Sequence, residues 1–340
     1  YSLIRSMTHG NNGHETAAYL VQTGRASDRD VFPGLGAVVS YFKGYRAGYD
    51  DVIPPYIVLT QPQGRFSEAG FLGPAYKPFA TGGNPNSTPF TVEGIVSPDI
   101  TEEHQKERRK LLGKLNTLGG ALPGNSTLKT VVDSNDEAYE LILGDAGKLF
   151  DLGQEEEKMR ERYGRNTFGQ SCLMARRLVE KGVPYITINY RGWDTHKGHF
   201  PIMNRQLPDF DNGLSTMLED LEHLGLLDST IDWGGGEFGR GPKVQWNAPW
   251  NGGRSHYGHV FNSVVAGGGF QGCQVLGSSD SRVEYVKDRQ VYQCDLIAIM
   301  YLLLGIDRIA TLPHPQGKSV YVSQTGEEGY DIGGPLLVIM

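Results

Sequence analysis

Two kinds of hydrophobic pattern alternate along the chain. Short apolar runs, rich in β-branched and aromatic residues, predict strands. They lie at 3–7, 53–60, 185–190, 230–233, 262–266 and 274–276. Longer stretches with apolar residues three and four positions apart predict helices. They lie at 14–22, 34–45, 167–181, 204–224 and 295–304.

This alternation favours a single α/β domain over residues 1–340, in which a largely parallel central sheet carries helices on both faces. Residues 101–183 depart from the alternation because they contain helical patterns only. We therefore expect a helical insert at about 100–183, packed as an accessory layer, with its charged helix from Glu102 to Lys114 exposed.

Composition narrows the class of protein. The chain of 340 residues has 32 Lys and Arg against 39 Asp and Glu, a net charge of −7. This mild acidity argues against a nucleic-acid partner, since phosphate binding needs a basic surface. No apolar run reaches the roughly 20 residues of a membrane-spanning helix. The three cysteines form no C-x-x-C pair, which excludes a disulfide framework and a thiolate zinc site and leaves room for one disulfide.

The chain starts at Tyr1, directly on a strand-like run, and no charged n-region followed by an apolar h-region is visible. We therefore see no signal peptide in these residues. We expect an upstream part of the fold to be missing, so that the domain is truncated at its start.

The histidines are the most informative residue type. Six of the nine form three close pairs, each just after a predicted strand or in the loop that follows one. The pairs are His9 with His14, His196 with His199, and His256 with His259. In open α/β sheets the carboxyl ends of the strands form the ligand-binding edge. The pattern predicts a polar site at that edge.

Asp194 and His196 follow the strand at 185–190, and their oxygen and nitrogen atoms suit a hydrolytic zinc or manganese site. A plain surface turn is the alternative. Downstream, a glycine-rich run presents Glu237 and Arg240, either as a metal ligand and an anion clamp or as an ordinary ion pair. A dinucleotide fingerprint is disfavoured there, because Pro242 prevents the helix that it requires.

Two further polar loops complete the candidate chemistry. A strand, a loop with His9 and His14, and a helix start follow one another at the beginning of the chain, which is an anion-binding arrangement. Residues 252–259 predict a second polar loop ahead of the strand at 262–266. The chain has no G-x-S-x-G elbow and no P-loop.

Six short motifs, taken in order, resemble the alkaline phosphatase/sulfatase superfamily. They are Arg5-Ser6-Met7, Thr23-Gly24-Arg25, Trp193-Asp194-Thr195-His196, Gly236-Glu237-Phe238-Gly239-Arg240, Gly253-Arg254-Ser255-His256 and Ala266-Gly267-Gly268-Gly269. The nearest branch is a group of exported, sulfatase-like proteins known only as a domain of unknown function. The likeness covers nearly the whole chain.

The resemblance implies an alkaline phosphatase-like fold and a metal-dependent hydrolase of sulfate or phosphate esters. It further implies metal ligands at Asp194, His196, Glu237 and His256 for zinc, calcium, magnesium or manganese. An exported or periplasmic location is also implied. The substrate would be a small anionic ester or a sulfated or phosphorylated glycan.

The other roles follow from the same comparison. We expect His14 and Arg240 to be catalytic. His9, Thr16 and Arg254 are expected to bind substrate. The position of the sulfatase nucleophile falls on His14, and the carboxylate next to the late histidine is replaced by Ser255.

These departures leave two hypotheses open. In the first, a metal-bound water or a loop nucleophile attacks the ester. In the second, the chain is a non-catalytic binding or structural relative that lost the nucleophile. We expect Asp194, His196 and His256 to converge, because all three follow strands of one predicted parallel sheet.

Overall fold

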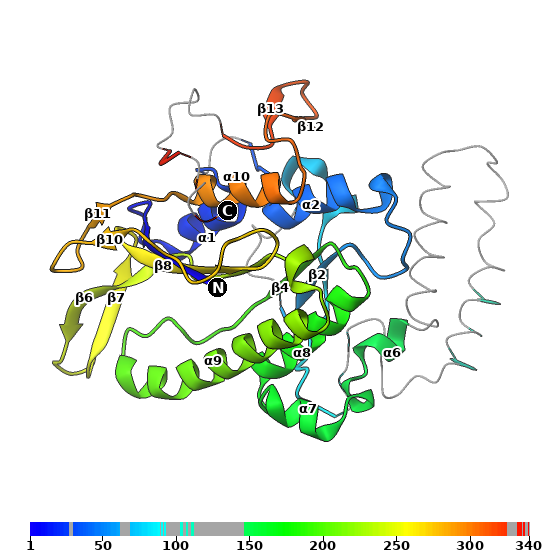
Figure 1. The fold of residues 1–340 in the computed structure, drawn as a ribbon, viewed down its shortest axis with the longest axis horizontal. Coiled ribbons are helices and arrows are strands. Elements are labelled where there is room, and N and C mark those ends of the chain that lie inside the picture. The colour runs from blue at the N-terminus through cyan, green and yellow to red at the C-terminus, as the bar shows by residue number, and fades with distance from the viewer. Residues whose placement is uncertain are drawn as a thin grey trace.

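The computed structural model describes residues 1–26, 30–61, 69–88 and 146–324, with isolated positions at 90, 92, 103–104, 107, 110–111, 332–334, 336 and 339. Over these residues the protein is a mixed α/β structure with several sheets, some of which contain parallel strands. Figure 1 shows helices on both sides of the strands.

The larger sheet has four strands in the order β5-β8-β1-β9. These are β1 (Ser2–Met7), β5 (Asp232–Gly235), β8 (Phe261–Ala266) and β9 (Val275–Leu276). Strand β8 runs antiparallel to both β1 and β5, whereas β9 runs parallel to β1.

The second sheet is parallel throughout and has the order β3-β2-β4. It consists of β2 (Tyr56–Leu59), β3 (Phe79–Ala80) and β4 (Tyr185–Ile188). The remaining strands pair as antiparallel ribbons, β6 with β7, β10 with β11 and β12 with β13. Their bounds are β6 (Gly239–Gln245), β7 (Gly253–Tyr257), β10 (Ser278–Ser279), β11 (Val286–Asp288), β12 (Thr311–Pro313) and β13 (Ser319–Tyr321).

The expectation of a largely parallel central sheet is therefore wrong for the four-stranded sheet. A parallel pair needs a long crossover, usually through a helix, to return the chain to the same end. Between β5 and β8 the chain instead makes the β6–β7 ribbon, which is a hairpin-like excursion, and it returns in the opposite direction. The hydropathy pattern does not report strand direction, because buried strands of both kinds are apolar.

Within the part of the chain that the structure describes, five helices of nine residues or more surround the sheets. They are α1 (His14–Thr23), α2 (Leu35–Lys43), α8 (Thr167–Glu180), α9 (His199–His223) and α10 (Gln293–Leu303). Two shorter helices are α6 (Ala146–Phe150) and α7 (Glu157–Arg162). Single 3₁₀ turns occupy Tyr45–Ala47, Gly70–Leu72, Pro74–Tyr76, Leu152–Gln154 and Leu227–Ser229.

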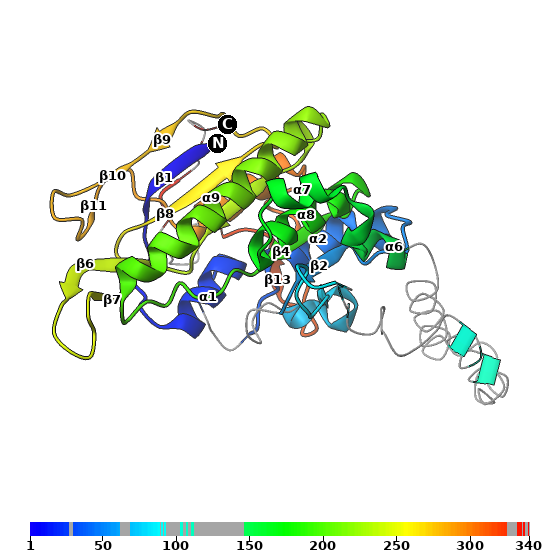
Figure 2. The ribbon, with the colours of Figure 1, turned by 90° about the horizontal axis from the view of Figure 1, so that it is seen from below.

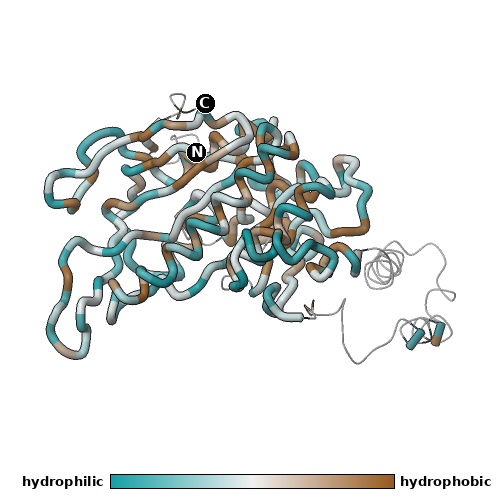
Figure 3. The backbone as a smooth tube through the Cα atoms, turned by 60° about the horizontal axis from the view of Figure 1, so that its bottom comes forward, coloured by the Kyte–Doolittle hydropathy of each residue, from teal (hydrophilic) through white to brown (hydrophobic). Residues whose placement is uncertain are grey.

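Helix α9 lies on one side of the four-stranded sheet and α10 on the other (Figures 1 and 2). In Figure 3 hydrophobic and hydrophilic residues alternate along the long helices, as amphipathic helices require. No helix among the described residues is both long and apolar enough to cross a membrane.

The buried side chains of the described residues form two large hydrophobic clusters. One joins β1 and β8 to α2 and α10 through side chains such as Ile4 and Leu296, both with no exposed surface. The other joins β2 to α8 and α9. Successive side chains of β2 point to opposite faces of its sheet. Ile57 therefore packs in the cluster with α8, whereas Val58 packs in a third, smaller cluster with Ala37 of α2.

The expected insert at about 100–183 is only partly described, since residues 112–145 lie outside the described residues. The described positions of its charged helix, such as Glu103 and Lys110, are exposed. Its last helix, α8, supplies fully buried side chains including Cys172 and Leu173 to the cluster around β2. That part of the segment belongs to the core.

Most helices lie within a few residues of their predicted bounds, and Gly24 ends α1 in the left-handed conformation (φ 68°) that glycine favours.

The prediction of a polar loop at 252–259 is wrong, because residues Gly253–Tyr257 form β7. This strand carries Arg254, Ser255 and His256, so it lacks the apolar alternation by which strands are recognised.

Asp232 is expected to make stability depend on pH. Burial at the start of β5 raises the pKa of its carboxyl to about 6, above the unfolded value of roughly 3.9. A raised carboxyl pKa stabilises the fold below about pH 4, and this contribution is lost as the pH rises through about 6. Urea denaturation should show Asp232→Asn gaining stability relative to wild type between pH 4 and pH 7. A constant difference across that range would contradict the prediction.

Candidate metal centre

The candidate site is assembled on β7 by two close backbone contacts. At its first residue, Gly253, an added Cβ would lie 1.7 Å from the carbonyl oxygen of His196. The next amide, of Arg254, donates to the carbonyl of Thr195 at 3.2 Å. The loop that follows β4 is thereby held against the start of β7.

The second contact lies just beyond the end of β7, at Gly258. The amides of His9 and Gly10 both donate to the Gly258 carbonyl at 3.0 Å, and the Gly258 amide donates to Oδ1 of Asn12 at 2.7 Å. A Cβ on Gly258 would lie 2.1 Å from the backbone oxygen of Asn11. The loop between β1 and α1 is thus fixed at the other end of the same strand.

The β6–β7 ribbon supplies the third side of the site. Arg240 lies opposite His256 in the ribbon, and the register shifts between Arg240 and Val244. Glu237 lies two residues before the start of β6. Three segments far apart in the sequence therefore meet beside His256.

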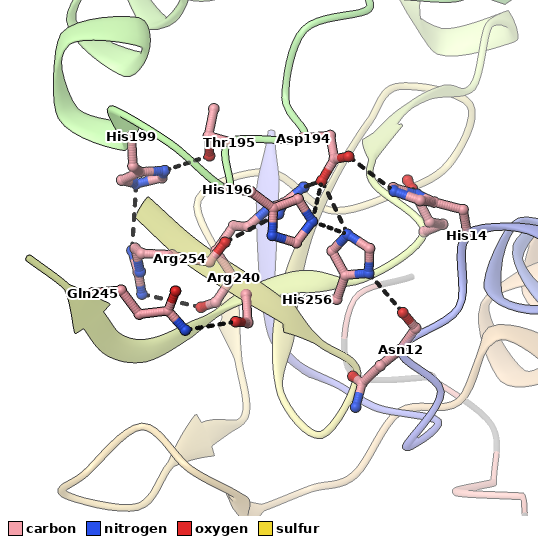
Figure 4. Close-up of polar contacts among 12 residues, drawn as sticks. Asn12, His14, Asp194, Thr195, His196, His199, Arg240, Gln245, Arg254 and His256 are labelled. Atoms are coloured by element: carbon pink, nitrogen blue, oxygen red, sulfur yellow. Dashed lines mark hydrogen bonds and ion pairs between the residues drawn. The ribbon is translucent and has the colours of Figure 1, made fainter. Parts of the chain in front are cut away.

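Asp194 is the centre of the resulting cluster (Figure 4). Its Oδ1 lies 3.0 Å from Nε2 of His256 and 3.1 Å from Nε2 of His196, and it also pairs with the Arg240 guanidinium. Its Oδ2 lies 3.2 Å from Nε2 of His14. The side chains of Asp194 and His14 are both close to half exposed, at 48% and 46%, so the cluster opens to solvent.

His14 links the two acidic residues of the site. It is the first residue of α1, and its Nδ1 lies 2.7 Å from Oε1 of Glu237. Because Nε2 faces Asp194, a single imidazole bridges two carboxylates.

The ring of His256 is oriented by a backbone carbonyl. Its Nδ1 lies 2.7 Å from the carbonyl oxygen of Asn12, an acceptor, so Nδ1 carries the proton. In the neutral ring Nε2 then holds a lone pair, which faces both Oδ1 of Asp194 and Nε2 of His196, the latter at 2.8 Å. Phe238 stacks on this ring at 4.4 Å between centroids and fixes its plane.

The protonation equilibria follow from these contacts. Partial burial would raise the pKa of the Asp194 carboxyl, but its polar contacts, above all that with the Arg240 guanidinium, outweigh it and hold that pKa well below its usual range. Burial lowers the pKa of His196, and the neighbouring His256 and Arg240 act in the same direction, while Asp194 opposes them. An ionised carboxylate and a neutral imidazole therefore stand side by side.

One ligand atom each from His14, Asp194 and His256 lies within 4.8 Å of the others. Two ligands at about 2.1 Å from a tetrahedral ion are roughly 3.4 Å apart, close to the separations measured around Asp194. His196 and Glu237 lie next to this group and contact it directly. All four predicted metal ligands and both predicted catalytic residues thus come together.

The three predicted substrate-binding residues are placed differently. His9 receives a hydrogen bond from the Asn11 amide on Nδ1 and contacts the Glu237 carbonyl through Nε2 at 2.6 Å, so both ring nitrogens bond to backbone. Arg254 donates from Nε and Nη2 to backbone carbonyls of β6. Thr16 is exposed in the first turn of α1.

Sequence reasoning missed several residues of the site. Asn12 acts through its backbone carbonyl, which no motif reveals. Phe238 lies between the candidate residues Glu237 and Arg240 in the glycine-rich run. That position was the signal that could have indicated it. Thr195 and His199 bond to each other at 2.7 Å, a spacing of four residues that could have suggested contact.

The fold and site define a mixed α/β protein with a surface cluster of imidazole and carboxylate groups. Residues 1–330 match the family described as "Protein of unknown function (DUF1501)", and the chain belongs to that family. This confirms the domain-of-unknown-function part of the resemblance. No curated protein and no solved structure matched.

The close contact at Gly253 generates a paired test. Gly253→Ala should lower the free energy of unfolding by about 1–3 kcal/mol, because the new methyl group must displace the loop that holds His196. Gly241→Ala in the facing strand is the control, since its Cβ would meet nothing closer than 3.6 Å. Urea denaturation of both variants measures the difference. Equal effects would show that the backbone contact does not constrain the site.

Proposed function

We propose that this protein is a metal-dependent hydrolase of sulfate or phosphate esters, with an alkaline phosphatase-like ancestry. The observation that carries the proposal is the convergence of imidazole nitrogens on one carboxylate. It is supported by the order of the motifs along the chain and by Arg240 beside the cluster.

The hydrogen bonds around Asp194 support a cation between this carboxylate and the neighbouring imidazole nitrogens. His256 donates from Nδ1 to the Asn12 carbonyl, so its neutral ring presents a lone pair to Asp194. His14 has Glu237 at Nδ1 and Asp194 at Nε2, so a cation bound between Nε2 and Asp194 would take the place of a proton on Nε2. Acceptors that face one another repel unless a proton or a cation lies between them.

The donor set indicates the class of ion. Imidazole nitrogens with carboxylate oxygens suit zinc or manganese, whereas calcium and magnesium prefer oxygen ligands alone. His14, Asp194 and His256 would hold the ion, with His196 and Glu237 at its edge. The carbonyl of Asn12 fixes the tautomer of His256, as expected for a ligating histidine. A bound divalent cation would neutralise ester oxygens and activate an attacking water.

The other side chains would bind and orient the ester. The Arg240 guanidinium is held by Asp194 and by the carbonyl of Arg254, which lies 3.2 Å from Nη1. A planar guanidinium in this position suits a tetrahedral sulfate or phosphate anion. The groups that contact Asp194 are imidazole and guanidinium groups, so we propose water as the nucleophile and a ligand role for His14.

One observation favours the non-catalytic alternative. By the resemblance to sulfatases, His14 stands at the nucleophile position, and it contacts both Asp194 and Glu237. A relative of this kind would hold the cation and would turn over no ester.

The test compares two variants of the same helix turn. His14→Ala should weaken binding of zinc or manganese by at least about tenfold and should lower ester hydrolysis in parallel. Thr16→Ala should leave cation binding intact. Bound metal is measured by elemental analysis after dialysis, and turnover is measured with p-nitrophenyl phosphate and p-nitrophenyl sulfate.

The outcomes separate the hypotheses. Hydrolysis that survives in His14→Ala would reject the role assigned to His14. Metal bound by wild type without turnover of either ester would favour the non-catalytic relative. Wild type that binds no divalent cation would overturn the metal centre itself.

A further inference from the structure

Thr195 lies between two predicted metal ligands but points away from them. Figure 4 shows its hydroxyl directed to His199, while Asp194 and His196 reach toward His256. Thr195 is 1% exposed and His199 is 8% exposed, in contrast to the open cluster beside them. A buried polar pair therefore lies behind the exposed cluster.

The direction of the hydrogen bonds in this pair follows from Arg254. Its Nη1 lies 3.5 Å from Nε2 of His199 and can only donate, so Nε2 accepts. Nδ1 of His199 then carries the proton and donates to Oγ1 of Thr195 at 2.7 Å. Burial, and after it the charges of Arg254 and Arg240, lower the pKa of His199, in agreement with a neutral ring.

These contacts close into a ring with the cluster. The Arg254 amide donates to the Thr195 carbonyl at 3.2 Å, and its Nη2 donates to the Arg240 carbonyl at 3.0 Å. The guanidinium of Arg240 in turn pairs with Asp194. Arg254 thus holds Asp194 in two ways: it bonds to the backbone of the next residue, Thr195, and it bonds to Arg240, whose guanidinium pairs with the Asp194 side chain.

The loop itself has little regular structure to hold it. Within it the Thr195 amide contacts the Trp193 carbonyl at 2.9 Å, and the His196 amide contacts the Asp194 carbonyl at 3.2 Å. Such tight local turns leave the side-chain directions of Asp194 and His196 dependent on what anchors Thr195.

We infer that Thr195 and His199 are positioning residues, whose hydrogen bond holds Asp194 and His196 in the orientation that binds the cation. The inference rests on the proposed metal centre. It assigns to this buried pair the part that supporting hydrogen bonds play around metal ligands, where their loss commonly weakens affinity by about 10- to 100-fold.

The experiment measures the affinity of the full chain for zinc and for manganese by calorimetry. Thr195→Val keeps the side-chain shape and removes the hydroxyl, so affinity should fall by about 10- to 100-fold. Thr195→Ser restores the hydroxyl and should recover most of it. His199→Phe should weaken binding similarly, whereas His199→Asn retains an amide donor near the Nδ1 position and should recover part of it. Ser215→Ala, on the exposed side of the same helix, is the control.

Each result bears on a separate claim. Circular dichroism first establishes that the variants are folded; should Thr195→Val fail to fold, the comparison of His199→Phe with His199→Asn carries the test. Wild-type affinity in Thr195→Val and in His199→Phe would overturn the inference and leave the metal centre standing. Wild type that binds neither metal would overturn the metal centre and the inference together.

Discussion

The candidate site depends on close backbone packing at the two ends of β7. At Gly253 and at Gly258 there is no room for a side chain, because backbone oxygens of His196 and Asn11 occupy the space. These contacts bring the loop after β4 and the loop after β1 to opposite ends of a five-residue strand. His256 lies between these two loops. The site is therefore built on the two-stranded ribbon of β6 and β7.

The electrostatics of the cluster follow from this assembly. Asp194 contacts His14, His196, Arg240 and His256 while remaining close to half exposed. A carboxylate surrounded in this way is held ionised, and burial disfavours charge on His196. Exposure and charge together suit a small ion that enters from solvent, while the buried pair of Thr195 and His199 provides a fixed support.

Most of the helices and several strands could be predicted from the sequence, because the spacing of apolar residues reflects which face of an element is buried. Strand β1 and helix α1 appear as predicted, and the histidine pairs indicated the region of the site. Strand direction and β7 were missed for physical reasons. Antiparallel pairing follows from the ribbon between β5 and β8, and β7 carries polar side chains where a pattern-based prediction requires apolar ones. Backbone acceptors such as Asn12 leave no trace in residue type.

Anomalous diffraction from crystals of the protein grown with zinc tests the central claim most directly, because it locates the ion without reference to activity. The metal centre predicts a peak within about 2.0–2.2 Å of a His14 nitrogen, an Asp194 oxygen and Nε2 of His256. A map with no peak there, in which Asp194 still bonds directly to His256, would contradict it.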